Sequence, residues 1–181
     1  MARPASALRG QILESALRLF AADGFRGTSL QDIATDAGCS KASLLYHFTS
    51  KDAILTELLT PAAEGVAALL ARLEGLEGEP LVDEAVTGFV EITLRFRQEM
   101  RLLFAEIERA SDEPGLGVMD LFEGLLDAFT ARSSDPRDRV AAWMAIGAVF
   151  VTSTGNDEVP HEVLRTELIL GVRRLLDHTP S

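Results

Sequence analysis

Side chains that suit contacts with nucleic acid are concentrated between residues 28 and 51. They offer hydroxyl, amide, imidazole and ammonium groups, and they are Thr28, Ser29, Gln31, Ser40, Lys41, Ser43, Tyr46, His47 and Lys51. Ammonium groups donate hydrogen bonds to guanine edges or phosphates, and small hydroxyls serve either partner. Groups of these types can contact nucleic acid only if local helices present them on one side.

Groups suited to catalysis or metal binding are few and scattered. The chain has one cysteine, Cys39, and three histidines, His47, His161 and His178, with no phosphate-binding loop and no metal-ligand spacing among them. A lone cysteine excludes a disulfide within the chain. We therefore expect no enzymatic activity, no catalytic residue, no metal and no cofactor, and we expect Cys39 to pack in a turn.

Two short helices must hold the polar residues. The first is predicted to begin at Thr28 or Ser29, where residues 28–31 have the form of a capping box, and to end before Gly38. Ser40 is a good N-cap for the second, which runs from Lys41 to about Phe48. Two helices joined by a glycine-containing turn have the form of a helix-turn-helix, although many helical proteins contain such a corner without binding DNA.

The charge distribution is uneven along the chain. The formal net charge is −11, which on average repels a polyanion. Residues 1–56 carry six basic and five acidic side chains, however, so the remaining part carries −12. The only two lysines, Lys41 and Lys51, stand at the starts of two predicted helices. An acidic solvated surface accounts for the rest of the chain.

Apolar residues elsewhere recur with helical spacing, which predicts an all-α fold. The expected helices span residues 11–22, 51 onward, 81–96, 98–109, 118–131, 136–151 and 160–176. Pro61 interrupts the helix that begins at Lys51, so we expect a kink or a fresh start at Thr60. The helix after Pro136 is apolar on all sides, which predicts that it is covered on more than one side.

No apolar leader follows Met1, and the longest uncharged run, residues 140–156, is 17 residues long with a polar end. A membrane span needs about 20 apolar residues. We therefore expect a cytoplasmic protein with no membrane contact.

Residues 24–55, GFRGTSLQDIATDAGCSKASLLYHFTSKDAIL, resemble the DNA-binding domain of TetR-family regulators. The resemblance implies that the second helix of the motif enters the major groove with Lys41, Ala42, Ser43, Tyr46 and His47. It also implies phosphate contacts from Thr28, Ser29 and Lys51, with Gln31 near a base and Ser40 at the turn. Leu45 departs from the pattern, because the family usually has an aromatic residue there, and this removes one expected phosphate contact.

The resemblance further implies two domains with different functions. An N-terminal three-helix helix-turn-helix domain, residues 1–50, is followed by a larger helical ligand-binding and dimerisation domain, residues 51–181. The last two helices are expected to form an isologous homodimer, so that two recognition helices reach successive major grooves of palindromic double-stranded operator DNA.

The resemblance places an effector site inside the helices after the fourth. The candidate lining residues are apolar or aromatic, and they are Phe89, Phe96, Met100, Phe104, Met119, Phe122 and Trp143. Such a lining suits a small apolar or aromatic effector of unknown identity. The expected function is a ligand-released repressor; an activator, or a helical DNA-binding protein without an inducer, remains an alternative.

Overall fold

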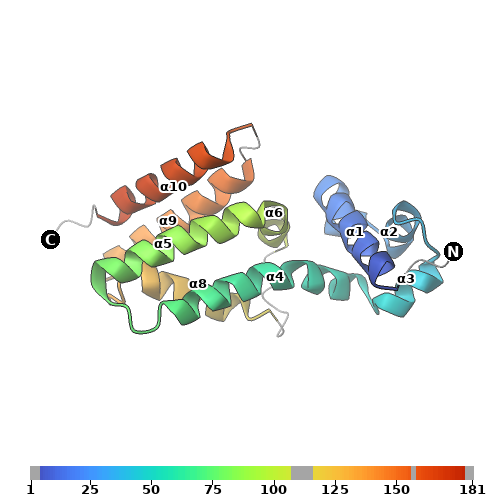
Figure 1. The fold of residues 1–181 in the computed structure, drawn as a ribbon, viewed down its shortest axis with the longest axis horizontal. Coiled ribbons are helices and arrows are strands. Elements are labelled where there is room, and N and C mark those ends of the chain that lie inside the picture. The colour runs from blue at the N-terminus through green and yellow to red at the C-terminus, as the bar shows by residue number, and fades with distance from the viewer. Residues whose placement is uncertain (1–4, 107–115, 156–157, 178–181) are drawn as a thin grey trace. The chain divides into compact units, whose positions relative to one another are not determined.

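The structure is a computed structural model that describes residues 5–106, 116–155 and 158–177. Every regular element in these ranges is a helix (Figure 1), which confirms the predicted all-α class. The chain divides into two compact units. Unit 1 contains residues 1–61 and 101–116, and unit 2 contains residues 62–100 and 117–181. The functional boundary expected near residue 50 stays a prediction.

Unit 1 is built on three helices, α1 (Ala5–Gly27), α2 (Leu30–Asp36) and α3 (Lys41–His47). The backbone of α1 leaves helical geometry at Gly24 (φ 75°, ψ 160°), shortly after residue 22, where the first helix was predicted to end. Apolar side chains from the three helices and from the following helix form a buried core, which contains Ile12, Ala16, Phe20, Phe25, Ile33, Leu44, Phe48 and Ile54. Packing in this core fixes the orientation of α2 and α3 within unit 1.

Helix α4 (Lys51–Arg72) is a single helix that contains Pro61. The fresh start predicted at Thr60 is therefore wrong, and the hydroxyl of Thr60 instead donates to the carbonyl oxygen of Thr56 at 2.8 Å. Proline removes one backbone donor from a helix. Because Pro61 is exposed, the carbonyl that loses its helical partner can be solvated, and the helix continues.

In length and composition α4 could cross a membrane, since its 22 residues include an 18-residue window with a mean hydropathy of 1.5. One such helix among the described residues is weak evidence, because core helices of globular proteins pass the same test. Its residues Leu58, Leu59, Ala62 and Leu69 are buried within the chain. The absence of a membrane contact stays a prediction.

Unit 2 combines the second half of α4 with α5 (Gly78–Arg95), α8 (Val118–Phe129), α9 (Pro136–Gly155) and α10 (His161–Leu176). Helix α6 (Arg97–Ala105) spans the division between the units. A Cβ atom on Gly88 would lie 2.5 Å from Leu69, and one on Gly124 would lie 2.7 Å from Leu70. Glycine at these two positions therefore allows α5 and α8 to approach α4 closely.

The helix predicted over residues 118–131 ends earlier in the structure. Helix α8 ends at Phe129 instead of residue 131, because Ala131 (φ 49°) and Arg132 (φ 62°) adopt left-handed backbone geometry. There the Arg132 guanidinium donates to the carbonyl oxygen of Leu76 at 2.8 Å, which ties the turn to the end of the α4–α5 connection. The predicted end of the 98–109 helix lies outside the described residues.

Helix α9 is apolar on two opposite sides, as predicted from its sequence. One side is buried in unit 2 through Ala142, Ala145, Ile146 and Val149. On this chain alone, the other side and part of α10 are exposed and form an apolar face, hereafter the α9–α10 face. This face consists of Val140 (59% exposed), Trp143, Met144, Val151, Val163 and Leu170.

Candidate nucleic-acid interface

The N-terminus of α2 is closed by a capping box formed by Ser29 and Asp32. The Asp32 backbone N–H donates to Ser29 Oγ at 3.2 Å, and the Ser29 N–H donates to the Asp32 carboxylate at 2.9 Å. The predicted box, residues 28–31, was therefore wrong by one position. Thr28 is instead buried, and its hydroxyl donates to the carbonyl oxygen of Gly24 at 2.9 Å.

The capping box determines which groups at the N-terminus of α2 can bind a DNA phosphate. A helix N-terminus favours a nearby anion, and here the Asp32 carboxylate already occupies that position. Its hydrogen bonds to the Ser29 side chain and backbone lower the pKa of Asp32, so the group carries its negative charge at neutral pH. Of the two residues expected to bind phosphate here, exposed Ser29 presents its side chain to solvent and buried Thr28 does not.

Gln31 lies on the exposed side of α2, two residues after the cap Ser29. Its side-chain amide donates to the hydroxyl of Thr35 at 3.3 Å, and that hydroxyl donates to the carbonyl oxygen of Gln31 at 2.8 Å. This contact lies on the surface. The predicted contact of Gln31 with a base therefore requires its side chain to turn away from Thr35.

The turn between α2 and α3 has the geometry that the sequence predicts. Gly38 adopts a positive φ of 66°, and its N–H donates to the carbonyl oxygen of Thr35 at 3.1 Å. Ser40 caps α3 and accepts from the N–H of Ser43 at 3.1 Å. Cys39 is partly buried at this turn, and burial raises the pKa of its thiol.

Helix α3 separates a buried side from an exposed one. Leu44 and Phe48 are buried. We call the exposed side the recognition face, and it consists of Lys41, Ala42, Leu45 and Tyr46. Tyr46 is 85% exposed, and Leu45 is 43% exposed. Ser43 and His47 flank this face and are half-buried.

Lys51 is held by the protein backbone. Its Nζ atom donates to the carbonyl oxygens of Phe25 and Thr28, the latter at 2.7 Å, and lies 4.3 Å from the centroid of the Phe25 ring. Lys51 thus joins the start of α4 to the α1–α2 connection. Two of its three donors are used within unit 1, so the predicted phosphate contact would have to use the third.

The candidate effector residues have no common environment in the structure. Phe89 and Met100 are buried, and Phe96 and Phe122 are half-buried. Phe104, Met119 and Trp143 are each more than half exposed, and the Trp143 ring lies 4.4 Å from that of Phe122. The seven residues therefore do not line one described cavity, and their role stays a prediction.

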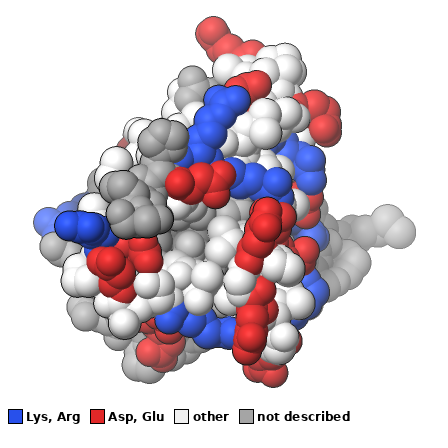
Figure 2. All heavy atoms as spheres, turned by 90° about the vertical axis from the view of Figure 1, so that its left-hand side faces the viewer, with Lys and Arg blue, Asp and Glu red and all other residues white. Residues whose placement is uncertain are grey.

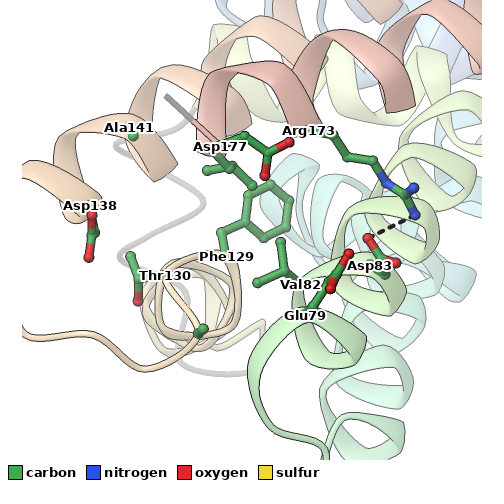
Figure 3. Close-up of a pocket in the computed structure, with 11 residues that line it drawn as sticks. Glu79, Val82, Asp83, Phe129, Thr130, Asp138, Ala141, Arg173 and Asp177 are labelled. Atoms are coloured by element: carbon green, nitrogen blue, oxygen red, sulfur yellow. Dashed lines mark ion pairs between the residues drawn. The ribbon is translucent and has the colours of Figure 1, made fainter. Parts of the chain in front are cut away.

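A pocket of about 540 Å³ lies within unit 2, where the ends of α5, α8, α9 and α10 meet (Figure 3). None of the seven candidate effector residues lines it. Its lining carries four carboxylates and one guanidinium, from Glu79, Asp83, Asp138, Asp177 and Arg173. Arg173 pairs with Asp83 at 2.8 Å, and the buried ring of Phe129 forms an apolar wall. Five of its eleven lining residues are thus charged, unlike the apolar lining expected from the sequence.

The acidic character of the chain is visible on unit 2. Figure 2 shows many Asp and Glu side chains on the face drawn there, with basic side chains interspersed among them. Unit 1 carries the only two lysines in the chain. Lys41 has no ion pair among the residues that the structure describes, so its ammonium group is available to a phosphate or a base.

A family model described as "Bacterial regulatory proteins, tetR family" matches residues 12–58, which contain α2, α3 and the start of α4. Over this segment the chain is similar to the TetR family. The match covers the capping box, the glycine turn and the whole recognition face. The resemblance predicted from residues 24–55 is therefore confirmed.

Two curated TetR-type relatives are similar over part of the chain. The HTH-type transcriptional regulator RutR of Escherichia coli K12 is 35% identical over 106 residues, which cover 58% of this chain and 50% of RutR. The HTH-type transcriptional repressor KstR2 of Mycobacterium tuberculosis H37Rv is 47% identical over 51 residues, which cover 28% of this chain and 26% of KstR2. The chain thus spans about half the length of RutR, and less of KstR2.

Two solved structures share the fold over nearly the whole chain. PfmR from Thermus thermophilus has a TM-score of 0.70 at 22% identity, over 94% of this chain and 99% of that one. AmtR from Mycobacterium smegmatis has a TM-score of 0.72 at 24% identity, over 96% of this chain and 87% of that one. At these identities the likeness concerns the fold alone.

Proposed function

We propose that this protein is a ligand-responsive transcriptional repressor that binds a palindromic operator as a homodimer through the recognition face of α3. The observation that carries the proposal is the recognition face itself. Lys41, Ala42 and Tyr46 are exposed on one side of a short helix whose other side is buried in unit 1. A lysine, a methyl group and a phenol suit guanine, thymine and phosphate respectively.

The charge of unit 1 defines how this binding works. With few basic residues, each helix-turn-helix domain makes few phosphate contacts. A single domain therefore binds DNA weakly, and the domains of two subunits must bind together. The α9–α10 face supports such a pairing, because it exposes six large apolar side chains on two neighbouring helices. A twofold arrangement would bury this face against its copy and form a four-helix interface.

Repression and release by a small apolar or aromatic effector complete the proposal. KstR2 is named as a repressor, and IcaR of Staphylococcus aureus (strain Newman), 45% identical over 47 residues, is named as a negative regulator. The buried ring of Phe89 and the half-buried ring of Phe96 support an aromatic effector. We place the protein in the cytoplasm, where its operator would be. An activator, or a regulator without an effector, is the alternative.

Binding to DNA from the region upstream of the gene tests the DNA-binding part. Fluorescence anisotropy is measured with the wild-type protein and with Lys41→Ala, in the presence of competitor DNA. We expect specific binding that weakens at least tenfold in Lys41→Ala. An absence of any specific complex at low salt would remove the proposal.

The oligomeric state tests the α9–α10 face. Sedimentation equilibrium is measured for Met144→Glu, which places a charge at the centre of the face, and for Ala68→Glu, which places the same charge on the exposed side of α4. We expect monomers for Met144→Glu and dimers for Ala68→Glu and the wild type. Dimers in both variants would exclude this interface.

A mass spectrum of the protein purified under native conditions tests the effector. A co-purified small molecule that releases the protein from operator DNA supports a ligand-controlled switch. Operator binding that no co-purified or added apolar compound changes supports a regulator without an effector.

A further inference from the structure

Arg9, near the start of α1, contacts two other helices of unit 1. Its Nε atom donates to Glu57 Oε1 on α4 at 2.8 Å, and its Nη2 atom donates to the other oxygen of the same carboxylate. Its Nη1 atom donates to the backbone carbonyl oxygen of His47 at 2.9 Å. The guanidinium carbon lies 4.3 Å from the centroid of the Phe48 ring. We call this arrangement the Arg9–Glu57 clamp.

The clamp acts on the end of α3. The last carbonyl groups of a helix have no partner within the helix, and a cation at this end is favourable. Helix α3 has only seven residues, and isolated helices of that length are unstable in water. The orientation of α3 therefore depends on contacts from outside the helix. The buried side chain of Leu44 lies in the middle of α3, and the clamp supplies a charged contact at its C-terminal end.

Each part of the geometry favours a positioning role over direct contact with DNA. The Arg9 side chain directs three hydrogen bonds into the protein and is 41% exposed, while the Glu57 side chain is 34% exposed. A planar guanidinium that binds a carboxylate with two nitrogens is fixed in direction as well as in charge. A carboxylate beside Arg9 also opposes the approach of a phosphate.

We propose that Arg9 and Glu57 are positioning residues for operator recognition, which hold the C-terminal end of α3 against α4 without contacting DNA. This inference rests on the proposed function and adds residues that the recognition helix does not contain. It has a counterintuitive consequence. Removing the negative charge of Glu57 should weaken binding to a polyanion, whereas removing a negative charge elsewhere on α4 should not.

The test compares Glu57→Gln with Glu64→Gln, a matched loss of charge at an exposed position on the same helix. Operator affinity is measured at three salt concentrations, together with Arg9→Ala, Arg9→Lys and the double variant Arg9→Ala/Glu57→Gln. We expect Glu57→Gln and Arg9→Ala each to weaken binding about tenfold with an unchanged salt dependence. The double variant should be no weaker than Arg9→Ala, because both changes remove the same contact.

Lysine at position 9 separates the two possible roles. It keeps the positive charge but cannot bond to both oxygens of Glu57 and to His47 in the same way. We expect Arg9→Lys to bind as weakly as Arg9→Ala. Rescue by lysine, a fall in the salt dependence by about one ion per half-site, or wild-type affinity in Glu57→Gln would overturn the proposal.

A measurement without DNA separates this proposal from the proposed function. Amide hydrogen exchange of residues 41–48 is followed in the wild type, Glu57→Gln and Glu64→Gln. We expect faster exchange in Glu57→Gln alone, and equal exchange in the three proteins would overturn the clamp. If the wild-type protein binds no operator, the proposed function fails, while the exchange result still decides whether the clamp holds α3.

Discussion

Lys51 Nζ lies 2.7 Å from the carbonyl oxygen of Thr28 and also donates to that of Phe25. The ammonium group thereby joins the start of α4 to the connection between α1 and α2. We predict that Lys51→Met, which keeps most of the aliphatic stem, lowers the free energy of unfolding by about 1–3 kcal/mol. Thermal and urea unfolding measure the change.

Lys41→Met is the matched control for this prediction. Lys41 is exposed and has no ion pair among the described residues, so its loss should change stability by less than about 0.5 kcal/mol. Equal stability of the two variants would mean that Lys51 is free to act elsewhere, as the phosphate contact expected from the sequence would require.

Mutation of two neighbouring leucines on α3 should change the stability of the protein to very different extents. Leu44 is fully buried and Leu45 is 43% exposed. We predict that Leu44→Ala lowers stability by about 2–5 kcal/mol, whereas Leu45→Ala leaves it almost unchanged. Leu45→Tyr should strengthen operator binding, because it adds a hydroxyl that can donate to a phosphate. Unfolding curves and anisotropy titrations measure the two effects, and a large loss of stability in Leu45→Ala would contradict the assigned faces of α3.

The Asp32 capping box should make stability depend on pH. The pKa of Asp32 is lowered in the folded protein by its hydrogen bonds to Ser29. Its stabilising effect is therefore fully present above the ordinary pKa of about 4, and it is lost as the pH falls through the lowered value. We predict that Asp32→Asn melts at a lower temperature than the wild type at pH 7, and that the difference disappears near the lowered pKa.

The thiol of Cys39 should react slowly at neutral pH. Burial raises its pKa, and the thiolate is the reactive form. We predict that iodoacetamide modifies folded Cys39 more slowly than an unstructured thiol, and that denaturant removes the difference. Mass spectrometry measures the modified fraction, and rapid modification of the folded protein would indicate an activated cysteine.

Local patterns in the sequence predict the helix-turn-helix of this protein well. The glycine turn at Gly38 and the cap at Ser40 depend on neighbours a few residues away, and the structure has them as predicted. The register of the α2 cap was missed by one residue. Thr28 and Ser29 can both cap a helix, and only the burial of Thr28 distinguishes them.

Contacts between distant residues could not be predicted in the same way. Arg9 and Glu57 are separated by 48 positions, and Lys51 and Phe25 by 26. Arginine, glutamate and lysine at helix surfaces fit solvated positions equally well, so no local pattern marks them as partners. The charged pocket around Arg173 was missed for the same reason, because four helices contribute to it.

In vitro selection from a random DNA library tests the central claim most directly, because it requires no knowledge of the operator. The wild-type protein and Lys41→Ala are each used for selection at moderate salt. We predict that the wild type enriches an inverted repeat whose half-site centres lie about 10 base pairs, or a multiple of that, apart. Lys41→Ala should enrich it weakly or with a changed base in each half-site. Enrichment of no sequence, or of a site without twofold symmetry, would contradict a dimeric regulator that reads DNA through α3.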